Sequence, residues 1–143
     1  MLSAAGTIIR LVLAFFLGGI IGLEREKKGR SAGLRTHILV CVGSALITLV
    51  SIYIYNQYSN QASIDPARIA AGVVTGVGFL GAGAIIRSPE GSYGLTTAAS
   101  VWVSAGIGMA VGCGYFSAAT AATIIVFLTL YFLKKADSKL TRQ

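Results

Sequence analysis

Charged residues are scarce in this chain. They make up 12% of its 143 residues, whereas an average soluble domain has roughly a quarter. Apolar residues make up 55% of the chain, and the mean hydropathy is +0.75. Histidine occurs once and cysteine twice. This composition excludes an ordinary soluble enzyme and indicates a membrane protein.

The few ionisable residues divide the chain into long uncharged runs, of which the last, Gly91 to Leu133, is long enough for two spans. A membrane-spanning helix needs about 20 apolar residues. We therefore predict an all-α, polytopic membrane helical bundle of about five transmembrane helices. The predicted spans are 5–23, 37–56, 66–87, 95–112 and 115–133. They form a single transmembrane domain over 1–143, and we expect no C-terminal soluble domain.

The basic residues predict the orientation of the bundle. Arg10 and Arg68 fall on one side, and the other ten lysines and arginines fall on the opposite side. The positive-inside rule then places the N-terminus outside and the C-terminus in the cytoplasm. The ten predicted cytoplasmic residues are Arg25, Lys27, Lys28, Arg30, Arg35, Arg87, Lys134, Lys135, Lys139 and Arg142.

Small residues recur at four-residue spacing in the predicted spans, which lets helices approach closely in lipid. Span 66–87 is the richest in glycine, and we expect it to be the central helix. Its glycines either serve packing alone or allow local unwinding between Gly76 and Gly83, which would free carbonyl oxygens to line a polar cavity. The residues predicted to pack helices together are Gly18, Gly22, Gly72, Gly76, Gly78, Gly81, Gly83, Ser104 and Gly108.

Polar residues gather where the predicted spans begin and end. Asp65 has the position of an N-cap before Pro66, and Arg68 can pair with it at the outer surface. Capping alone and a solute or partner site are both open for Asp65. At the inner surface, charged ends of three spans would form a partly desolvated cluster if they converge. The predicted functional residues are Glu24, Arg25, Arg35, Asp65, Arg68, Arg87, Thr96, Thr97 and Ser100.

Several chemistries are not expected. His37 is the only histidine and has no cysteine nearby, so no metal site is predicted. No nucleophile and base stand at a recognisable spacing, so we expect no enzyme. Residues 76–81 match G-x-G-x-x-G in the middle of a span with no strand before it, so no nucleotide cofactor is expected. Topology explains the basic loops, and no nucleic-acid partner is predicted.

Three segments look familiar together. They are Gly22–Glu26 leading to Ala32–His37, Asp65–Arg68 leading to Gly78–Gly83, and Gly94–Trp102. In this order they resemble the MgtC/SapB family of bacterial inner-membrane proteins. The resemblance maps the family's polar motif onto Glu24, Arg25, Arg35, Asp65 and Arg68, and its glycine signature onto Gly78, Gly81 and Gly83.

The family resemblance implies a bundle of about five spans and a link to growth in low magnesium and, for some members, to survival inside macrophages. It also implies a role in regulating other membrane proteins, with the ATP synthase as a proposed target. Many members continue into a cytoplasmic regulatory domain, whereas this chain stops shortly after Leu133. We therefore do not assume that such a domain senses an effector here.

Two functions are consistent with these observations. The first is a non-enzymatic regulator whose small-residue faces, including that of Gly108, dock against a second copy or another membrane protein. A homodimer or other homo-oligomer would then form. The second is a channel or transporter for a small ion, with Mg²⁺ as one option. In that case Asp65 and Arg68 would lie at the outer mouth, and the hydroxyls facing the glycine-rich span would be those of Thr96, Thr97 and Ser100.

Overall fold

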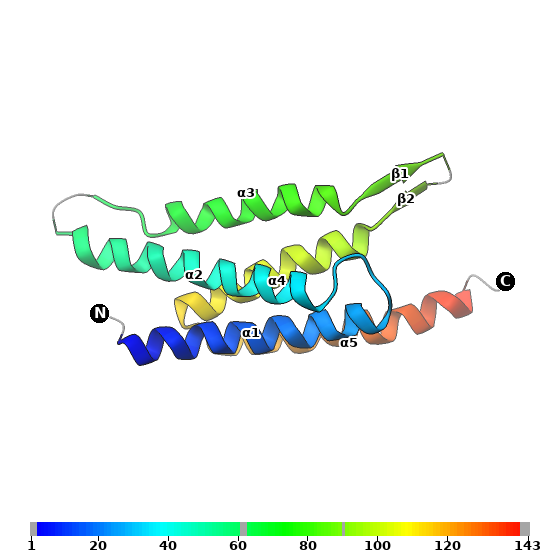
Figure 1. The fold of residues 1–143 in the computed structure, drawn as a ribbon, viewed down its shortest axis with the longest axis horizontal. Helices are drawn as coiled ribbons and strands as arrows, with labels where there is room; N and C mark the ends of the chain where they lie inside the picture. The colour runs from blue at the N-terminus through cyan, green and yellow to red at the C-terminus, as the bar shows by residue number, and fades with distance from the viewer. Residues whose placement is uncertain (1–2, 61–62, 90, 141–143) are drawn as a thin grey trace.

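The computed structural model describes residues 3–60, 63–89 and 91–140, with side chains as far as Phe132. These residues form five helices and one two-stranded hairpin, and the helices lie side by side in a bundle (Figure 1). The predicted all-α membrane bundle is therefore confirmed. The elements in chain order are α1 (Ala4–Lys27), α2 (Leu34–Tyr58), α3 (Ala67–Gly83), β1 (Ile86–Ser88), β2 (Gly91–Tyr93), α4 (Leu95–Cys113) and α5 (Phe116–Leu140).

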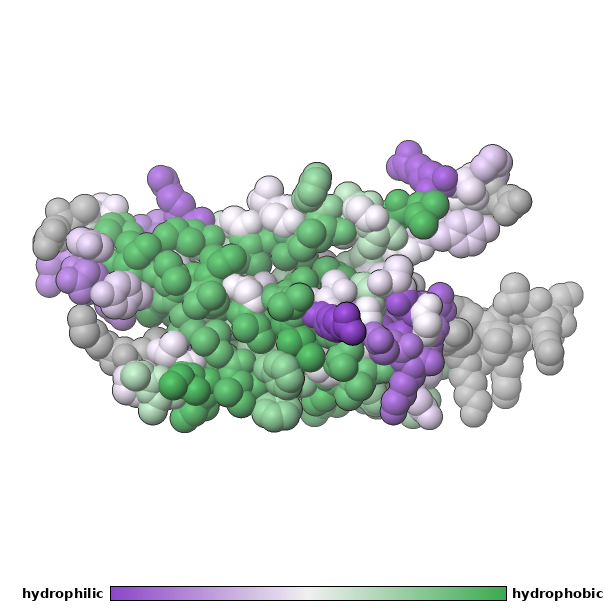
Figure 2. Space-filling model, in the orientation of Figure 1, coloured by the Kyte–Doolittle hydropathy of each residue, from purple (hydrophilic) through white to green (hydrophobic). Residues whose placement is uncertain are grey.

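The bundle exposes an apolar belt around its middle. Figure 2 shows hydrophobic residues covering the centre of one face and hydrophilic residues gathered at both ends. Helices α1, α2 and α4 are long and apolar enough to cross a membrane, whereas α3 and the Phe116–Phe132 part of α5 are shorter apolar helices. Large side chains such as Phe16, Trp102 and Ile125 are exposed on this belt. Lipid would cover an apolar surface of this extent.

Helix α4, and not α3, is at the centre of the bundle. It packs against each of the other four helices, whereas α3 packs mainly against α2 and α4. The expectation that the glycine-rich span is central was wrong. Only one face of α3 is buried, through Ala70, Val73, Val77 and Gly81. Glycine content gave the wrong central helix because small residues permit close packing but do not specify which face of a helix has a neighbour.

Glycines allow the closest helix crossings. A Cβ at Gly18 would lie 2.8 Å from the His37 carbonyl oxygen, and one at Gly22 would lie 2.7 Å from the Leu34 Cα. A Cβ at Gly108 would lie 3.0 Å from the Cys41 Cα, with the Cys41 carbonyl oxygen closer still. These positions bring the backbones of α1 and α4 against α2, and in each case the obstacle is a backbone atom that cannot easily move.

Helix α3 is shorter than the predicted span 66–87. It begins where the Ala67 N–H donates to the Asp65 carboxylate over 2.8 Å. It runs without a break to Gly83, so of the two alternatives for its glycines, local unwinding between Gly76 and Gly83 is wrong. Residues 86–93 then form the hairpin, in which Ile86 pairs with Tyr93. Arg87 therefore lies on a strand and does not close α3.

The two ends of the bundle differ in charge. We call the end that carries loop 28–33, the hairpin and the end of α5 the basic end, because Arg25, Lys28, Arg30 and other predicted cytoplasmic cations lie there. At the opposite end Arg10 donates to the Gly112 carbonyl oxygen over 2.6 Å and lies 5.7 Å from the centre of the Phe116 ring. Which end faces the cytoplasm stays a prediction. The side chains of Lys134, Lys135, Lys139 and Arg142 lie outside the described residues.

Candidate functional site

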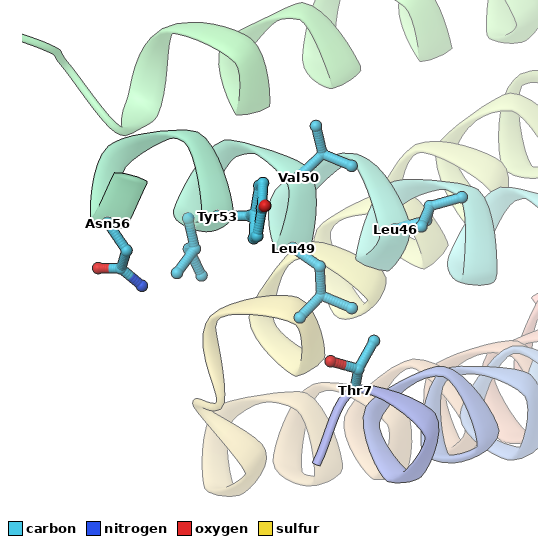
Figure 3. A pocket seen from close by; sticks show the side chains of 7 residues that line it. Thr7, Leu46, Leu49, Val50, Tyr53 and Asn56 are labelled. Atoms are coloured by element: carbon cyan, nitrogen blue, oxygen red, sulfur yellow. The ribbon is translucent and has the colours of Figure 1, made fainter. Parts of the chain in front are cut away.

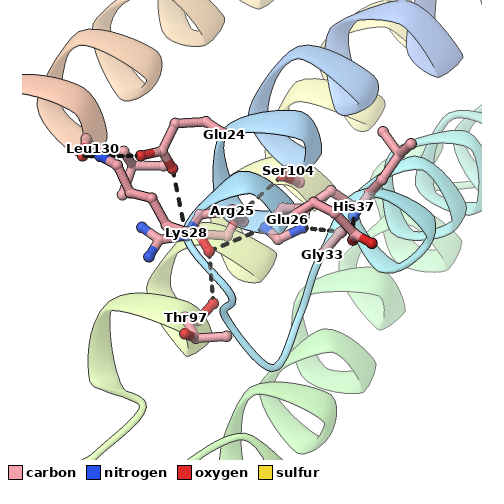
Figure 4. A network of polar contacts seen from close by, with 11 residues as sticks. Glu24, Arg25, Glu26, Lys28, Gly33, His37, Thr97, Ser104 and Leu130 are labelled. Carbon is pink, nitrogen blue, oxygen red and sulfur yellow. Dashed lines mark hydrogen bonds and ion pairs between the residues drawn. The ribbon is translucent and has the colours of Figure 1, made fainter.

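A cluster of polar side chains is buried at the basic end, where the end of α1 meets the starts of α2 and α4 (Figure 4). The sequence placed charged helix ends on this side and left open whether they converge. The structure brings two of the four predicted charged residues of this side together, namely Glu24 and Arg25. His37 and the α4 hydroxyls complete the cluster, which we call the basic-end cluster. Its members are Glu24, Arg25, Lys28, His37, Thr97, Ser100 and Ser104.

Glu24 is the acidic centre of the cluster. Its side chain forms ion pairs with Lys28, one helical turn later, and with Arg25, whose Nε lies 3.6 Å from Glu24 Oε2. Lys28 also donates to the Leu130 carbonyl oxygen of α5 over 2.9 Å. Glu24 and Arg25 are exposed by only 5% and 3%. Lys28 therefore joins the end of α1 to α5, and the buried Arg25 Nε has no hydrogen-bond acceptor among the described residues.

His37 joins α2 to α4. It is fully buried, with Nδ1 2.8 Å from the Gly33 carbonyl oxygen and Nε2 3.0 Å from the Ser100 hydroxyl oxygen. A carbonyl oxygen only accepts, so the hydrogen is assigned to Nδ1, and in the neutral ring Nε2 accepts from Ser100. The Ser100 hydroxyl also lies 2.8 Å from the Thr97 carbonyl oxygen. Ser100 therefore has two alternative acceptors.

Most buried hydroxyls inside the bundle are satisfied by their own helix. Thr48 donates to the Ser44 carbonyl oxygen over 2.8 Å, and Ser104 donates to that of Ser100 over 2.9 Å. Thr123 donates to the Ala119 carbonyl oxygen over 2.8 Å. Hydroxyls engaged in this way act as small packing residues and need no solute to complete their hydrogen bonds.

A pocket with both polar and apolar lining opens beside the basic-end cluster. It has a volume of about 530 Å³ and lies between loop 28–33, the end of the hairpin, the start of α4 and α5. We call it the basic-end pocket. Two cations and several hydroxyls line it, and the lining residues are Arg25, Arg30, Ser92, Tyr93, Gly94, Leu95, Thr96, Thr97, Thr129 and Leu130.

The other predicted functional residues are separated from this site. Arg35 and Arg87 are at the basic end but exposed. Asp65 and Arg68 are exposed at the opposite end. Within the described residues no ion pair joins Asp65 to Arg68, and the Asp65 carboxylate instead caps α3. Of the three predicted hydroxyl residues, Thr97 and Ser100 are buried and Thr96 is exposed in the basic-end pocket.

The glycines of α3 differ from those of α1 and α4. A Cβ at Gly81 would meet Ala98 of α4 at 3.7 Å. A Cβ at Gly72, Gly76, Gly78 or Gly83 would meet nothing within 4 Å in the described chain. The predicted packing role of these four glycines is therefore not fulfilled inside one chain. Gly72 and Gly76 line an apolar groove of about 480 Å³ between α3 and α2.

A second apolar pocket lies near the opposite end of the bundle. It has a volume of about 240 Å³ and lies between the start of α1 and the later turns of α2 (Figure 3). Thr7 faces Leu49 across it, and Tyr53 and Asn56 lie further along α2. This lining is almost entirely apolar, so the pocket suits a hydrocarbon chain better than an ion.

Sequence reasoning missed three residues of the basic end. The spacing of Glu24 and Lys28, four residues apart on one helix, is a signal that could have predicted their ion pair. His37 was placed at the start of the second predicted span and considered as a metal ligand, but its burial depends on the crossing of α2 and α4, which the sequence does not show. Arg30 was interpreted as a charge that orients the protein and touches anionic lipid, and was not assigned to a pocket. Among the described residues no group of three or more histidine, cysteine or acidic side chains is placed to hold a metal ion.

Comparison with known proteins gives consistent matches. A family model described as "MgtC family" matches residues 11–139. The chain is 47% identical over 125 residues to "Putative magnesium transporter YhiD" of Escherichia coli strain K12, an alignment that covers 86% of this chain and 58% of that protein. It is 43% identical over 135 residues to "Protein MgtC" of Salmonella typhimurium strain LT2, which covers 94% of this chain and 55% of that protein.

The chain therefore spans little more than half the length of these relatives. No solved structure matches it.

Proposed function

Because the chain belongs to the MgtC family, we propose that it is a non-enzymatic, multi-pass protein of the bacterial inner membrane that regulates other membrane proteins. The setting is adaptation to low magnesium or to host stress. Docking takes place within the membrane, either with a second copy or with another membrane protein such as the ATP synthase.

The observation that best supports this proposal is the exposed face of α3. Gly72, Gly76 and Gly83 leave open space on it, and Phe79, exposed by 82%, projects from it. Glycine in a membrane helix lets another helix approach closely, and that benefit is lost if only lipid covers the face. A face rich in glycine and without a neighbour in its own chain is therefore suited to a partner helix.

A substitution that fills this open space tests the proposal. Gly76→Leu should leave the fold of the chain intact, because Gly76 is exposed and a Cβ at this position meets nothing within 4 Å among the described residues. The matched control is Gly106→Leu on α4, another exposed position where a Cβ meets no described atom within 4 Å. In a strain that lacks the native protein, Gly76→Leu should fail to restore growth in low magnesium, and Gly106→Leu should restore it. Equal growth of both variants at equal membrane levels would overturn the proposal.

The alternative is a small-ion channel or transporter, and it is supported by the name of the E. coli relative, "Putative magnesium transporter YhiD". Against it, Asp65 and Arg68 lie at the opposite end from the basic-end pocket, and the hydroxyls between them are bonded to their own helices. Mg²⁺ flux into liposomes that contain the purified chain separates the two functions. Flux above empty vesicles that is lost in Asp65→Asn would favour transport.

A further inference from the structure

We infer that the basic-end pocket binds a phosphate group, supplied either by the headgroup of an anionic phospholipid or by free inorganic phosphate. The inference does not depend on whether the chain regulates or transports. It rests on three features of the pocket: an arginine with unused donors, a positive charge balance, and an uncapped helix start.

Arg25 is the first feature. It lines the pocket and is 3% exposed, yet within the described residues its guanidinium donates no hydrogen bond. The nearest oxygen of Glu24 is 3.6 Å from Nε, which makes an ion pair but is too long for a hydrogen bond. A guanidinium carries five N–H donors, and the donor at Arg25 Nε is buried without an acceptor, which is costly. A phosphate oxygen is an acceptor that a guanidinium binds in bidentate geometry.

The charges around the pocket favour an anion. Arg25 and Arg30 line the pocket. Lys28 lies close to Arg25, because both residues form an ion pair with Glu24. Glu24 cancels one of these three positive charges and does not line the pocket. Glu26, the other acid near the end of α1, accepts from the Leu34 N–H over 2.8 Å and does not line the pocket either. Among the described side chains, the pocket therefore keeps an excess of positive charge.

The start of α4 is the third feature. Its first residue is Leu95, and Gly94 before it provides no side-chain cap. The first backbone N–H groups of a helix have no partner within the helix, and they favour anions. The N–H groups of Leu95 and Thr96 and the hydroxyls of Ser92 and Thr96 belong to residues that line the same pocket as Arg25. They supply neutral donors that complement the two arginines.

The location of the pocket suits a lipid headgroup as well as a free anion. It lies at the basic end beside Thr129 and Leu130 of α5, next to the apolar belt. Basic pockets between transmembrane helices on the cytoplasmic side commonly bind anionic headgroups. A headgroup would place its phosphate between Arg25 and Arg30 and leave its acyl chains along α5.

Two binding measurements on the detergent-solubilised full chain distinguish the sources. Native mass spectrometry compares phosphatidylglycerol with phosphatidylcholine, and equilibrium dialysis measures radiolabelled inorganic phosphate against chloride at equal ionic strength. Preferential binding of phosphatidylglycerol assigns the site to a headgroup. Saturable binding of phosphate without a lipid preference assigns it to the free anion. Binding of neither probe overturns the inference.

Variants test whether binding occurs in this pocket. Arg30→Gln removes a lining cation that forms no ion pair within the described residues, so folding should be unaffected, and the affinity for the bound probe should fall about tenfold. Arg35→Gln is the matched control, because Arg35 is exposed at the same end but does not line the pocket, and it should keep the affinity of the unmodified chain. Arg25→Gln should lose more affinity than Arg30→Gln if it folds. Equal losses in Arg30→Gln and Arg35→Gln would overturn the inference, since they would indicate a general surface effect.

Discussion

The Nε2 atom of His37 lies 3.0 Å from the hydroxyl oxygen of Ser100, a contact that joins α2 to α4 across 63 positions of the sequence. His37 is fully buried, and its other ring nitrogen is held by the Gly33 carbonyl oxygen at 2.8 Å. The two contacts tie the start of α2, the start of α4 and the loop between α1 and α2 into one unit. This unit holds the starts of α2 and α4 together at the basic end.

Breaking the His37–Ser100 contact should destabilise the bundle. We expect His37→Ala to lower the free energy of unfolding by about 1–3 kcal/mol, because it removes a fully buried side chain and its hydrogen bonds to the Gly33 carbonyl oxygen and to Ser100. The double-mutant cycle with Ser100→Ala should give a coupling energy near the average of about 0.6 kcal/mol for such bonds in membranes. Unfolding in mixed micelles by added denaturing detergent measures both. Fully additive effects would show that the contact contributes nothing.

Arg10 should stabilise the opposite end. Its guanidinium donates to the Gly112 carbonyl oxygen near the end of α4, where the helix dipole is negative, and it lies over the Phe116 ring. Arg10→Ala should cost about 1.5–3 kcal/mol, the usual range for a hydrogen bond to a charged group. The exposed Arg68 at the same end is the control, and Arg68→Ala should stay within about 0.5 kcal/mol. Thermal unfolding in detergent gives both values, and equal shifts would contradict the role of Arg10.

Gly108 should be essential for the fold and not for assembly between chains. A Cβ there would press on the backbone of Cys41, so α2 and α4 would have to separate. Gly108→Ala should destabilise the chain by about 1–3 kcal/mol, whereas Gly106→Ala, which meets nothing within 4 Å, should be neutral or slightly stabilising. Thermal unfolding distinguishes them. The expectation from the sequence that the Gly108 face docks between chains is corrected by its burial against α2.

Glycine at position 94 should be required for the hairpin to pack against the start of α4. Its φ is +88°, and a Cβ would collide with the Ala84 carbonyl oxygen. Gly29 has a φ of +61° but nothing within 4 Å of a Cβ. Gly29→Ala should therefore cost only the left-handed strain of about 1–2 kcal/mol, and Gly94→Ala should cost clearly more. Hydrogen exchange of the hairpin amides should rise in Gly94→Ala alone; equal protection in both variants would contradict this.

The sequence predicted where the helices lie along the chain better than which helices contact one another. Uncharged runs are sufficient to locate the helices because lipid admits few other backbone structures. The bounds of α1, α2 and α4 agree with the predicted spans to within a few residues. Span 66–87 was too long because the uncharged run continues through Ile85 and Ile86, where the backbone has already turned into the hairpin. Apolar composition alone does not distinguish a helix from a short apolar strand.

The candidate site was only partly predictable for a related reason. Glu24 and Arg25 were predicted to be functional because they are charged residues at a helix end, and both are buried in the structure. Asp65 was predicted for the same reason, yet it caps α3 and is exposed. What separates these cases is whether a neighbouring helix covers the side chain, as α5 does when Leu130 accepts from Lys28. Such contacts join residues far apart in the chain, and no local pattern encodes them.

The proposed regulatory role requires that α3 presents its open face to another protein, and photo-crosslinking in the native membrane tests this directly. A benzophenone side chain is placed at Phe79 on α3 or at Phe16 on α1, two phenylalanines exposed by 82% and 60%. Illumination should give a discrete protein adduct, with a second copy or another membrane protein, at Phe79 and only lipid products at Phe16. No protein adduct at Phe79, or the same adducts at both positions, would contradict the claim.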